Sequence, residues 1–377
     1  MNMGKVKLMV SSAFAIAFTV LVLTAVHGAT SDDKQSTRIR SSPQWEDGRF
    51  VNPNGLEVKL LSWEALSVTI DYLLTIRKRK EARPEKPVPT VKIDPAEWTN
   101  TDPKRFDYAW LGHASVLVAL EGKIILIDPV FEKRVSAVSW YGPERFFPPP
   151  MDTSTLPVID AVVITHSHYD HLEEPTIRTL SKANTIFLVP LGIGSILQKW
   201  GVDPERITEL DWWESYKLDT VTFHATPAIH SSMRGIWDFA QQLWCSWAIT
   251  GAYRRFFVSG DSGYYEGFTE VGKRLGPFDA AFLKIGSYSD AGVWRKGHMT
   301  PEEAIRQAMD IRAEMVVPLH WATFDLELYD WHDSIVRAVK EAAAKDVTLV
   351  TPIPGRKMSG EQRDVDTRWW RDLITSK

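Results

Sequence analysis

The chain has 377 residues, of which 44% are hydrophobic and 24% charged, and its formal net charge is −4 at pH 7. This length allows a large buried core, and the mildly acidic balance argues against a nucleic-acid-binding protein, which usually carries a clear basic excess. The single cysteine, Cys245, excludes an intrachain disulfide framework and a cysteine-rich metal site.

The N-terminus has the pattern of a targeting segment. A short basic stretch precedes an uncharged apolar run, Leu8 to Val26, and small polar residues follow. This order predicts a secretory signal peptide over residues 1–29, with cleavage near Gly28 or Ala29, although the run is also long enough for an uncleaved membrane anchor. Either alternative predicts an exported protein, periplasmic or anchored on the membrane and facing away from the cytoplasm.

Residues 30–100 are expected to form an N-terminal extension and linker. Within them, Leu56 to Lys80 shows apolar residues at helical spacing and ends in a basic run. A helix packed on the body is favoured over an interfacial membrane helix with basic anchors. The proline-rich residues 81–90 are typical of a linker.

From residue 101 to residue 377 the pattern predicts one α/β domain. Short apolar runs typical of buried strands alternate with helical stretches, which predicts sheets with helices packed outside them. A threonine cap followed by proline and glutamate predicts a helix over 300–311, and another is expected over 333–346. Strands are expected at 108–120, 124–130, 160–165, 185–190, 221–228, 254–260, 279–286 and 314–320.

The densest group of candidate metal ligands follows the strand at 160–165 and comprises His166, His168, Asp170 and His171. An H-x-H-x-D-H cluster cannot lie on one face of a regular element, but a loop at a strand end can turn these side chains toward one point. Imidazole and carboxylate are good zinc ligands, so a solvated histidine-rich turn is the less favoured interpretation. Four ligands from one loop cannot all serve one cation with an open position, which favours two metals with further ligands from later strands.

Those later ligands are expected where three apolar runs end, at His230, Asp261 and His320. Asp261 lies in the string GDSG, which resembles the nucleophile loop of a trypsin-like serine protease with Ser262 as the reacting residue. The protease interpretation is disfavoured, because Tyr264 follows where that loop has a further glycine and because a triad is identified by geometry rather than by a short string. Asp261 is therefore the better candidate, as a carboxylate that bridges two metals.

These motifs occur in the order typical of the metallo-β-lactamase superfamily, and more narrowly the chain resembles the N-acylphosphatidylethanolamine-hydrolysing phospholipase D family. The H-x-H-x-D-H string indicates only the superfamily, whereas HMTPEEA together with HWATF is narrower. The matching strings are DGRFVNP (47–53), WLGHASVLV (110–118), THSHYDHL (165–172), FVSGDSGY (257–264), LGPFDAAFLKIGSY (275–288), HMTPEEA (298–304) and LHWATF (319–324).

The resemblance implies an αββα sandwich of the metallo-β-lactamase type with two zinc ions at its edge, for which iron and manganese are alternatives. It also implies that a hydroxide between the metals attacks phosphorus, that Asp170 orients this nucleophile, and that His298 and Tyr288 contact the substrate. His113 is expected to be structural and satisfied by backbone groups, and His224 to share a strand face with His230. The implied ligand sets are His166, His168 and His230 for one metal, Asp170, His171 and His320 for the other, and Asp261 for both.

The implied reaction is hydrolysis of N-acylphosphatidylethanolamine-type phospholipids to N-acylethanolamine and phosphatidic acid at a membrane surface, with no nucleic acid as partner. The aromatic and proline-rich residues 139–151 are expected either to meet the lipid or to form a packed surface loop. Two alternatives stay open, a lactonase or phosphodiesterase of a soluble small molecule and, less favoured, a non-catalytic membrane-tethered metal-binding protein. Because residues 231–239, 287–297 and 328–334 depart from the family pattern, lipid specificity is open, as is homodimer formation.

Overall fold

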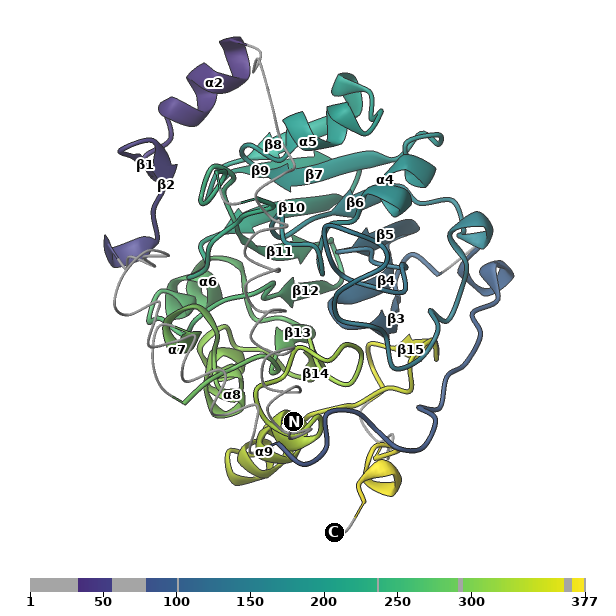
Figure 1. The fold of residues 1–377 in the computed structure, drawn as a ribbon. Helices are drawn as coiled ribbons and strands as arrows, with labels where there is room; N and C mark the ends of the chain where they lie inside the picture. Colours follow the sequence, from purple (N-terminus) through teal and green to yellow (C-terminus); the bar gives the residue numbers. More distant parts are fainter. Residues whose placement is uncertain are drawn as a thin grey trace, which may run out of the picture.

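Two β-sheets that pack face to face form the middle of the molecule (Figure 1). This computed structural model describes residues 33–55, 79–99, 102–235, 237–290, 294–362 and 368–375. The first sheet has the strand order β15–β3–β4–β5–β6–β7–β8 and the second has the order β14–β13–β12–β11–β10–β9. Their strands are β3 (Phe106–Gly112), β4 (Ser115–Leu120), β5 (Lys123–Ile127), β6 (Ala161–Val163), β7 (Ile186–Pro190), β8 (Ile207–Leu210), β9 (Ser215–Leu218), β10 (Val221–Thr226), β11 (Ser246–Thr250), β12 (Arg255–Val258), β13 (Ala280–Lys284), β14 (Val316–Leu319) and β15 (Met358–Ser359).

Helices cover the outer faces of both sheets (Figure 1). On the first sheet lie α4 (Glu174–Leu180) and α5 (Gly194–Lys199), and on the second lie α6 (Phe268–Leu275), α8 (Pro301–Asp310) and α9 (Asp333–Ala344). The described chain also contains α2 (Asp33–Arg40), the hairpin β1 (Trp45–Glu46) and β2 (Arg49–Phe50), α7 (Trp294–Gly297), and the short 3-10 helices η1 (Pro53–Gly55), η2 (Pro95–Trp98), η3 (Thr153–Thr155), η4 (Pro204–Arg206) and η5 (Arg371–Leu373).

The packing of β4 shows why these layers form. Successive side chains of a strand point to opposite faces, so its apolar residues divide between two cores. Val116 and Val118 belong to the core between the sheets, whereas Leu117 and Ala119 pack in the second core with Ile177 of α4. Every residue of β4 is buried, as a strand covered on both faces requires. The layering is helix, sheet, sheet, helix, which confirms the αββα sandwich.

The run expected as one strand over 108–120 folds as two antiparallel strands instead. Gly112 has a φ of +104° and His113 a φ of +52°, which reverses the chain between β3 and β4. Trp110 then pairs with Val116, and Gly112 pairs with Ser115. The sequence-based expectation was wrong here because a continuous apolar run conceals a turn made of small or polar residues.

The carboxyl ends of several strands meet at one edge of the sandwich. β5, β6 and β7 run parallel, as do β12, β13 and β14. β10 has the same direction as β12, because both pair antiparallel with β11. Residues 166–171 follow β6, His230 follows β10, Asp261 follows β12 and His320 follows β14, so the topology brings the candidate ligands to the edge where open α/β sheets bind ligands.

The helix predicted over 300–311 is confirmed as α8, and its start has the expected cap. The Thr300 hydroxyl accepts a hydrogen bond from the Glu303 amide at 3.3 Å, and the Glu303 carboxylate accepts one from the Thr300 amide at 3.0 Å. The helix predicted over 333–346 corresponds to α9. A capping box fixes a helix start through local contacts, which is why the sequence predicted it.

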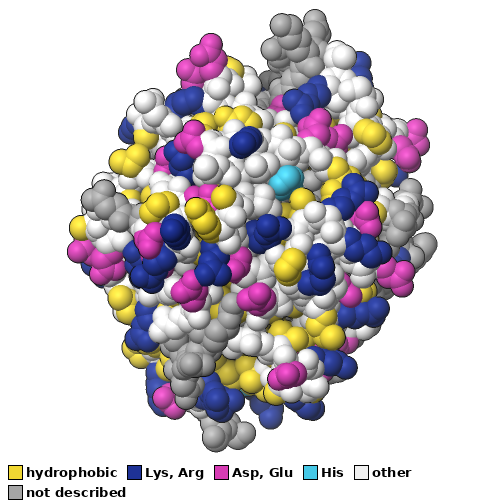
Figure 2. Space-filling view, turned by 180° about the vertical axis from the view of Figure 1, so that it is seen from behind, with side chains coloured by type: hydrophobic (Ala, Val, Ile, Leu, Met, Phe, Trp, Pro, Cys, Tyr) yellow, Lys and Arg dark blue, Asp and Glu magenta, His cyan; other side chains and the backbone are white. Residues whose placement is uncertain are grey.

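The N-terminal predictions fall largely outside the described residues: the signal peptide or anchor at 1–29 lies there, as does most of the helix predicted over 56–80. Within the described ranges, none of the helices combines the length and apolar character needed to span a bilayer. On the face of the molecule seen in Figure 2, basic and acidic side chains are interspersed rather than gathered by sign.

Candidate metal centre

The seven side chains predicted as metal ligands come together at this edge. They form overlapping groups with His113 and His298, and within each group the ligand atoms lie within 4.8 Å of one another. The groups are His166, His168 and His230; His113, Asp170, His171 and His320; His166, His171 and Asp261; and His230, Asp261 and His298. Residues far apart in the chain thus share one buried cluster, as the sequence predicted.

Three imidazoles face one another on one side of the cluster. The Nε2 of His166 lies 2.9 Å from the Nδ1 of His168, which lies 3.2 Å from the Nε2 of His230. Burial, together with the neighbouring histidines, holds the pKa of His166 well below its usual range, and burial lowers the pKa of His230 to about 3. These rings are therefore neutral, which is the form of histidine that binds a metal.

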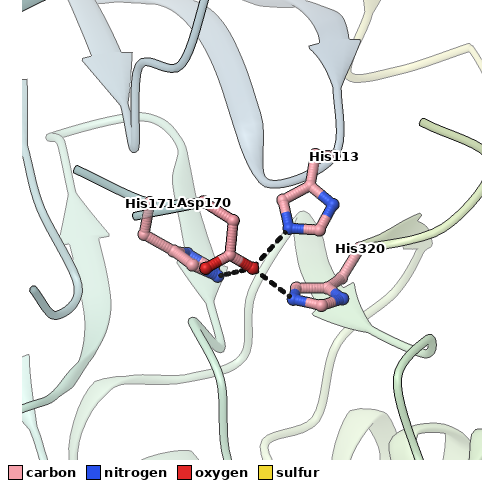
Figure 3. Close-up of side chains that lie close together, drawn as sticks. All are labelled: His113, Asp170, His171 and His320. Atoms are coloured by element: carbon pink, nitrogen blue, oxygen red, sulfur yellow. Dashed lines mark hydrogen bonds and ion pairs between the residues drawn. The ribbon is translucent and has the colours of Figure 1, made fainter. Parts of the chain in front are cut away.

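Asp170 stands among three histidines on the other side (Figure 3). Its Oδ2 lies 2.9 Å from the Nε2 of His113, 3.2 Å from that of His320 and 3.6 Å from that of His171. Burial opposes the charge on Asp170, but His171, His113 and His320 outweigh burial and keep its pKa well below the usual range. The carboxylate is ionised at neutral pH.

His113 differs from its expected structural role. Its main chain does serve the fold, because its carbonyl accepts a hydrogen bond from the His320 amide at 3.0 Å. Its ring, however, contacts the Asp170 carboxylate rather than backbone groups. The expectation was wrong because the turn between β3 and β4 points the ring into the cluster.

Asp261 lies between the two sides. Its Oδ1 is 3.4 Å from the Nε2 of His171, and its Oδ2 is 3.3 Å from the Nε2 of His320 and 3.9 Å from the Nε2 of His230. Burial opposes ionisation of this group, but the nearby His320 and His171 hold its pKa well below the usual range. An ionised carboxylate that reaches both histidine groups has the position that a bridging ligand needs.

The neighbouring Ser262 is not presented as a nucleophile. It is fully buried, and its hydroxyl accepts a hydrogen bond from the Ile229 amide at 2.9 Å and donates one to the Gly263 carbonyl at 2.7 Å. This serine holds main chain together beside the cluster, which agrees with the preference for Asp261 over a protease-like serine.

The donor atoms fit a divalent metal. The buried Nε2 atoms of His171 and His320 and the Oδ1 of Asp261 find no hydrogen-bond partner of good geometry among the residues that the structure describes. Leaving such atoms unsatisfied costs about 1–3 kcal/mol each, more where the group is charged. A cation among these imidazoles and carboxylates would satisfy all three atoms, and imidazole with carboxylate is a donor set that zinc prefers.

Two side chains that sequence analysis missed orient the loop histidines. The Asp128 carboxylate lies 2.8 Å from the Nδ1 of His171 and accepts a hydrogen bond from the Thr165 hydroxyl at 2.7 Å. That hydroxyl lies 2.9 Å from the Nδ1 of His166. Such partners at Nδ1 turn Nε2 toward a metal. The sequence signal was an aspartate directly after the buried strand β5.

Arg234 holds the same loop from outside and was also missed. Its guanidinium donates to the carbonyl of Ser167 at 2.8 Å and to that of Leu172 at 2.7 Å. It stacks on the rings of Tyr169 and Trp200, whose centroids lie 4.0 Å and 4.9 Å from its Cζ. One cation therefore ties both ends of the H-x-H-x-D-H loop.

Part of the cluster meets solvent. The side chains of Asp170 and His298 are 18% and 15% exposed, and His168 is partly buried, whereas His171, His230 and His320 are almost fully buried. His298 lies between α7 and α8, with its Nδ1 3.7 Å from the Oδ2 of Asp261. This position is compatible with the predicted contact to substrate, since a molecule arriving from solvent meets these side chains first.

The remaining candidates lie elsewhere. Tyr288 is fully buried, its hydroxyl donates to the Asp333 carboxylate, and Arg337 donates to it at 3.1 Å, so its contact with substrate stays a prediction. His224 is half-buried on β10, with its Nε2 3.3 Å from the Thr250 hydroxyl, and belongs to none of the groups above.

Comparison with known protein families shows to which family the chain belongs. Residues 123–321, more than half of the chain, match the family described as the β-lactamase superfamily domain. The chain belongs to the β-lactamase superfamily. The matched residues contain the whole proposed ligand set, from His166 to His320.

Two relatives share long stretches of sequence with this superfamily member. An uncharacterized protein of Mycobacterium tuberculosis is 37% identical over 366 residues, which cover 95% of this chain and 96% of the relative. The N-acyl-phosphatidylethanolamine-hydrolyzing phospholipase D 1 of Caenorhabditis elegans is 37% identical over 257 residues, which cover 64% of this chain and 72% of the relative. The resemblance inferred from the motifs is confirmed at the level of homology.

Solved structures share the fold of this superfamily member. Igni18, a metallo hydrolase from Ignicoccus hospitalis, aligns with a TM-score of 0.51 and 22% identity over 67% of this chain and 97% of that chain. At this identity the likeness shows the fold alone. The protein is thus a hydrolase of the metallo-β-lactamase fold with a histidine and aspartate cluster suited to metal.

Proposed function

We propose that the protein is a binuclear phosphodiesterase that hydrolyses N-acylphosphatidylethanolamine-type phospholipids to N-acylethanolamine and phosphatidic acid. One observation carries the proposal: a buried cluster of imidazoles and carboxylates, with the ligand atoms of each group within 4.8 Å. It lies in a chain that is 37% identical to a phospholipase D named for this substrate.

The ligand groups support two metal positions rather than one. His166, His168 and His230 would hold one ion, Asp170, His171 and His320 the other, and Asp261 both, with His113 beside Asp170. Zinc is the proposed metal, with iron and manganese as alternatives that suit the same donors. A pair of divalent cations supplies, when bound, activated water and positive charge for phosphodiester hydrolysis.

Two of the cluster's side chains are placed to act on the substrate itself. Asp170 is ionised and 18% exposed, so we propose that it orients the attacking water. The side chain of His298 is 15% exposed and otherwise buried. This burial, and secondly the positive charge of nearby Lys284, keep the pKa of His298 well below its usual range. A neutral imidazole there has one N–H to donate to a phosphoryl oxygen.

An aromatic loop supports action at a lipid surface. Trp140 and Tyr141 are 69% and 37% exposed, whereas Phe147 and Met151 of the same loop are buried. The buried side chains thus hold the loop on the body of the protein, while the rings of Trp140 and Tyr141 remain exposed. Tryptophan and tyrosine favour the interface between water and lipid, because one end of each ring system is apolar and the other polar. We propose the membrane surface as partner and export as the route to it.

The test is incubation of zinc-loaded protein with liposomes that contain N-acylphosphatidylethanolamine, beside soluble lactones, carboxylic esters and phosphodiesters. Release of N-acylethanolamine and phosphatidic acid, identified by mass spectrometry, is the expected result. Turnover of a soluble compound without turnover of the lipid would overturn the proposal in favour of a soluble-substrate hydrolase. Failure on every compound by metal-loaded protein would favour a non-catalytic metal-binding protein.

A matched pair of variants tests binding to the lipid surface separately from the hydrolysis step. Trp140→Ala is expected to slow turnover on liposomes but not on a monomeric short-chain lipid. Val158→Ala, at an 84% exposed position outside the aromatic loop, is the control and should change neither rate. Equal rates for Trp140→Ala and Val158→Ala on liposomes would remove the loop from the proposal.

A further inference from the structure

A side chain from before the superfamily domain reaches a candidate ligand. Asn52 lies in the string DGRFVNP, and it is 6% exposed. Its amide nitrogen donates to the His230 carbonyl at 2.8 Å, and its amide oxygen accepts from the His230 N–H at 2.8 Å. Both main-chain groups of His230 are thus bound by one side chain 178 residues away in the sequence.

The segment that carries Asn52 is itself fixed to the body. Phe50 is buried, its amide donates to the Ala240 carbonyl at 2.8 Å, and its ring meets that of Trp45 edge-on at 4.9 Å. The Val51 amide donates to the Gln44 carbonyl at 2.8 Å. Asn52 is therefore presented to His230 by an ordered hairpin and not by a free strand end.

His230 depends on such contacts because it lies beyond the end of β10, outside the sheet. Its ring has one nitrogen, Nδ1, 3.2 Å from the Gly297 carbonyl, and the other, Nε2, turned toward His168. The preceding residue, Ile229, is tied by Ser262 and Gly263. Asn52 completes this set of contacts by fixing the main chain of the ligand itself.

We propose that Asn52 is a positioning residue for the metal ligand His230, so that the segment preceding the superfamily domain completes the metal centre. The inference rests on the proposed assignment of His230 as a ligand. Removing a hydrogen-bond partner that orients a metal ligand commonly lowers the metal affinity by a factor of about 10–100. Because His230 serves one of the two proposed positions, loss of Asn52 should weaken one metal ion selectively.

The test is a zinc titration of the full chain against a competing chelator, with bound zinc counted by mass spectrometry of the metal. Asn52→Ala removes both hydrogen bonds, and Asn52→Asp keeps the size and the acceptor but loses the donor. Gln44→Ala is the matched control, because Gln44 also joins this hairpin to the body, through the Asp211 carboxylate at 3.3 Å. His230→Gln removes the ligand itself.

We expect Asn52→Ala to raise the dissociation constant of one zinc ion by about 10–100-fold, with the other ion unaffected. Asn52→Asp should show the same selectivity, and it carries the test if Asn52→Ala does not fold. Gln44→Ala should bind both ions as the wild type does. Equal zinc affinity in Asn52→Asp, Gln44→Ala and the wild type would overturn the inference.

The His230→Gln variant distinguishes the two levels of the proposal. If it loses one zinc ion while the Asn52 variants lose none, only the role of Asn52 fails. If it keeps both zinc ions, the assignment of His230 as a ligand fails, and the role of Asn52 fails with it.

Discussion

The two halves of the metal centre are built in different ways. The loop half, residues 166–171, supplies four candidate ligands from one turn after β6. The second-sheet half, comprising His230, Asp261, His298 and His320, supplies one side chain from each of four separate connections. The four ligands of the loop half are neighbours in sequence, whereas the side chains of the second half come together only when the second sheet has formed.

The halves also differ in what holds them. Side chains brace the loop half, since Asp128 contacts His171 and Arg234 ties the loop carbonyls. In the second half, main-chain carbonyls share this task with a side chain: the Gly297 carbonyl meets the His230 ring, the His113 carbonyl binds the His320 amide, and Asn52 binds the main chain of His230. Single substitutions can therefore remove the side-chain braces of either half, but not the contacts that main-chain carbonyls make in the second half.

The largest expected effect comes from removing the proposed metal, which would join the halves. Treatment with EDTA should abolish hydrolysis, and added zinc should restore it. Metal that binds only the folded state stabilises it by mass action, so the melting temperature should fall together with activity. Calorimetry and a phosphodiester assay on the same samples check both outcomes. Full turnover by protein shown to be metal-free would contradict the proposed chemistry.

Asp261→Asn should have the next largest effect, because Asp261 reaches histidines of both halves. We expect kcat to fall by at least the roughly 10²–10³-fold that follows loss of one preorganised hydrogen-bond donor at an active site, and bound metal should fall as well. Ser262→Ala is the adjacent control, expected to cost about 1 kcal/mol of stability through lost backbone hydrogen bonds and little activity. Equal losses of activity in the two variants would reopen the serine interpretation.

Asp128→Asn tests a brace of the loop half alone. The change keeps the shape but removes the charge that faces His171, so zinc affinity should fall by about 10–100-fold. Asp160→Asn is a suitable control, because Asp160 also accepts a main-chain hydrogen bond, from the Ile124 amide at 2.8 Å, but belongs to none of the ligand groups. Unchanged affinity in Asp128→Asn would show that the loop holds its histidines without this carboxylate.

Arg234→Lys should have the smallest effect on catalysis and a measurable one on stability. Lysine keeps the charge, and its one nitrogen could replace Nη1, which donates to both carbonyls, but it lacks the planar guanidinium face that stacks on the rings of Tyr169 and Trp200. We expect a loss of about 1–2 kcal/mol in the free energy of unfolding, from denaturant titration, because these cation–π contacts are lost. Arg178→Lys, on the exposed surface of α4, is the control and should cost less, because Arg178 pairs with Glu174 in solvent and donates to one carbonyl, that of Trp200. A neutral Arg234→Lys would mean that the loop is stable without the stacked guanidinium.

Sequence analysis predicted the parts of this molecule whose signals are local. The H-x-H-x-D-H loop, the capped start of α8 and the apolar strands are all encoded within a few residues. The ligands of the second half were predicted because each directly follows an apolar run. Their convergence itself, however, came from the resemblance to a family and not from spacing.

Contacts between distant segments were not predictable. Asn52 and His230 are 178 residues apart, and Arg234 ties a loop more than sixty residues before it. The residue type of Asn52 or Arg234 does not indicate its partner, because asparagine and arginine can form hydrogen bonds with many different groups. His113 was misjudged for the same reason, since its ring orientation depends on a reversal between β3 and β4 that the apolar run conceals.

The partial exposure of the cluster has a kinetic consequence. Ions, water and substrate reach the cluster past its partly exposed side chains, His168, Asp170 and His298, since the other ligands are buried in the described part of the chain. A phosphate ester resting there would block the exit of zinc, so a slowly hydrolysed substrate analogue should retard stripping of the metal by a chelator. The dissociation rate of the metal ions would then depend on whether a bound molecule blocks their exit, and not solely on the affinity of the ligands for the metal.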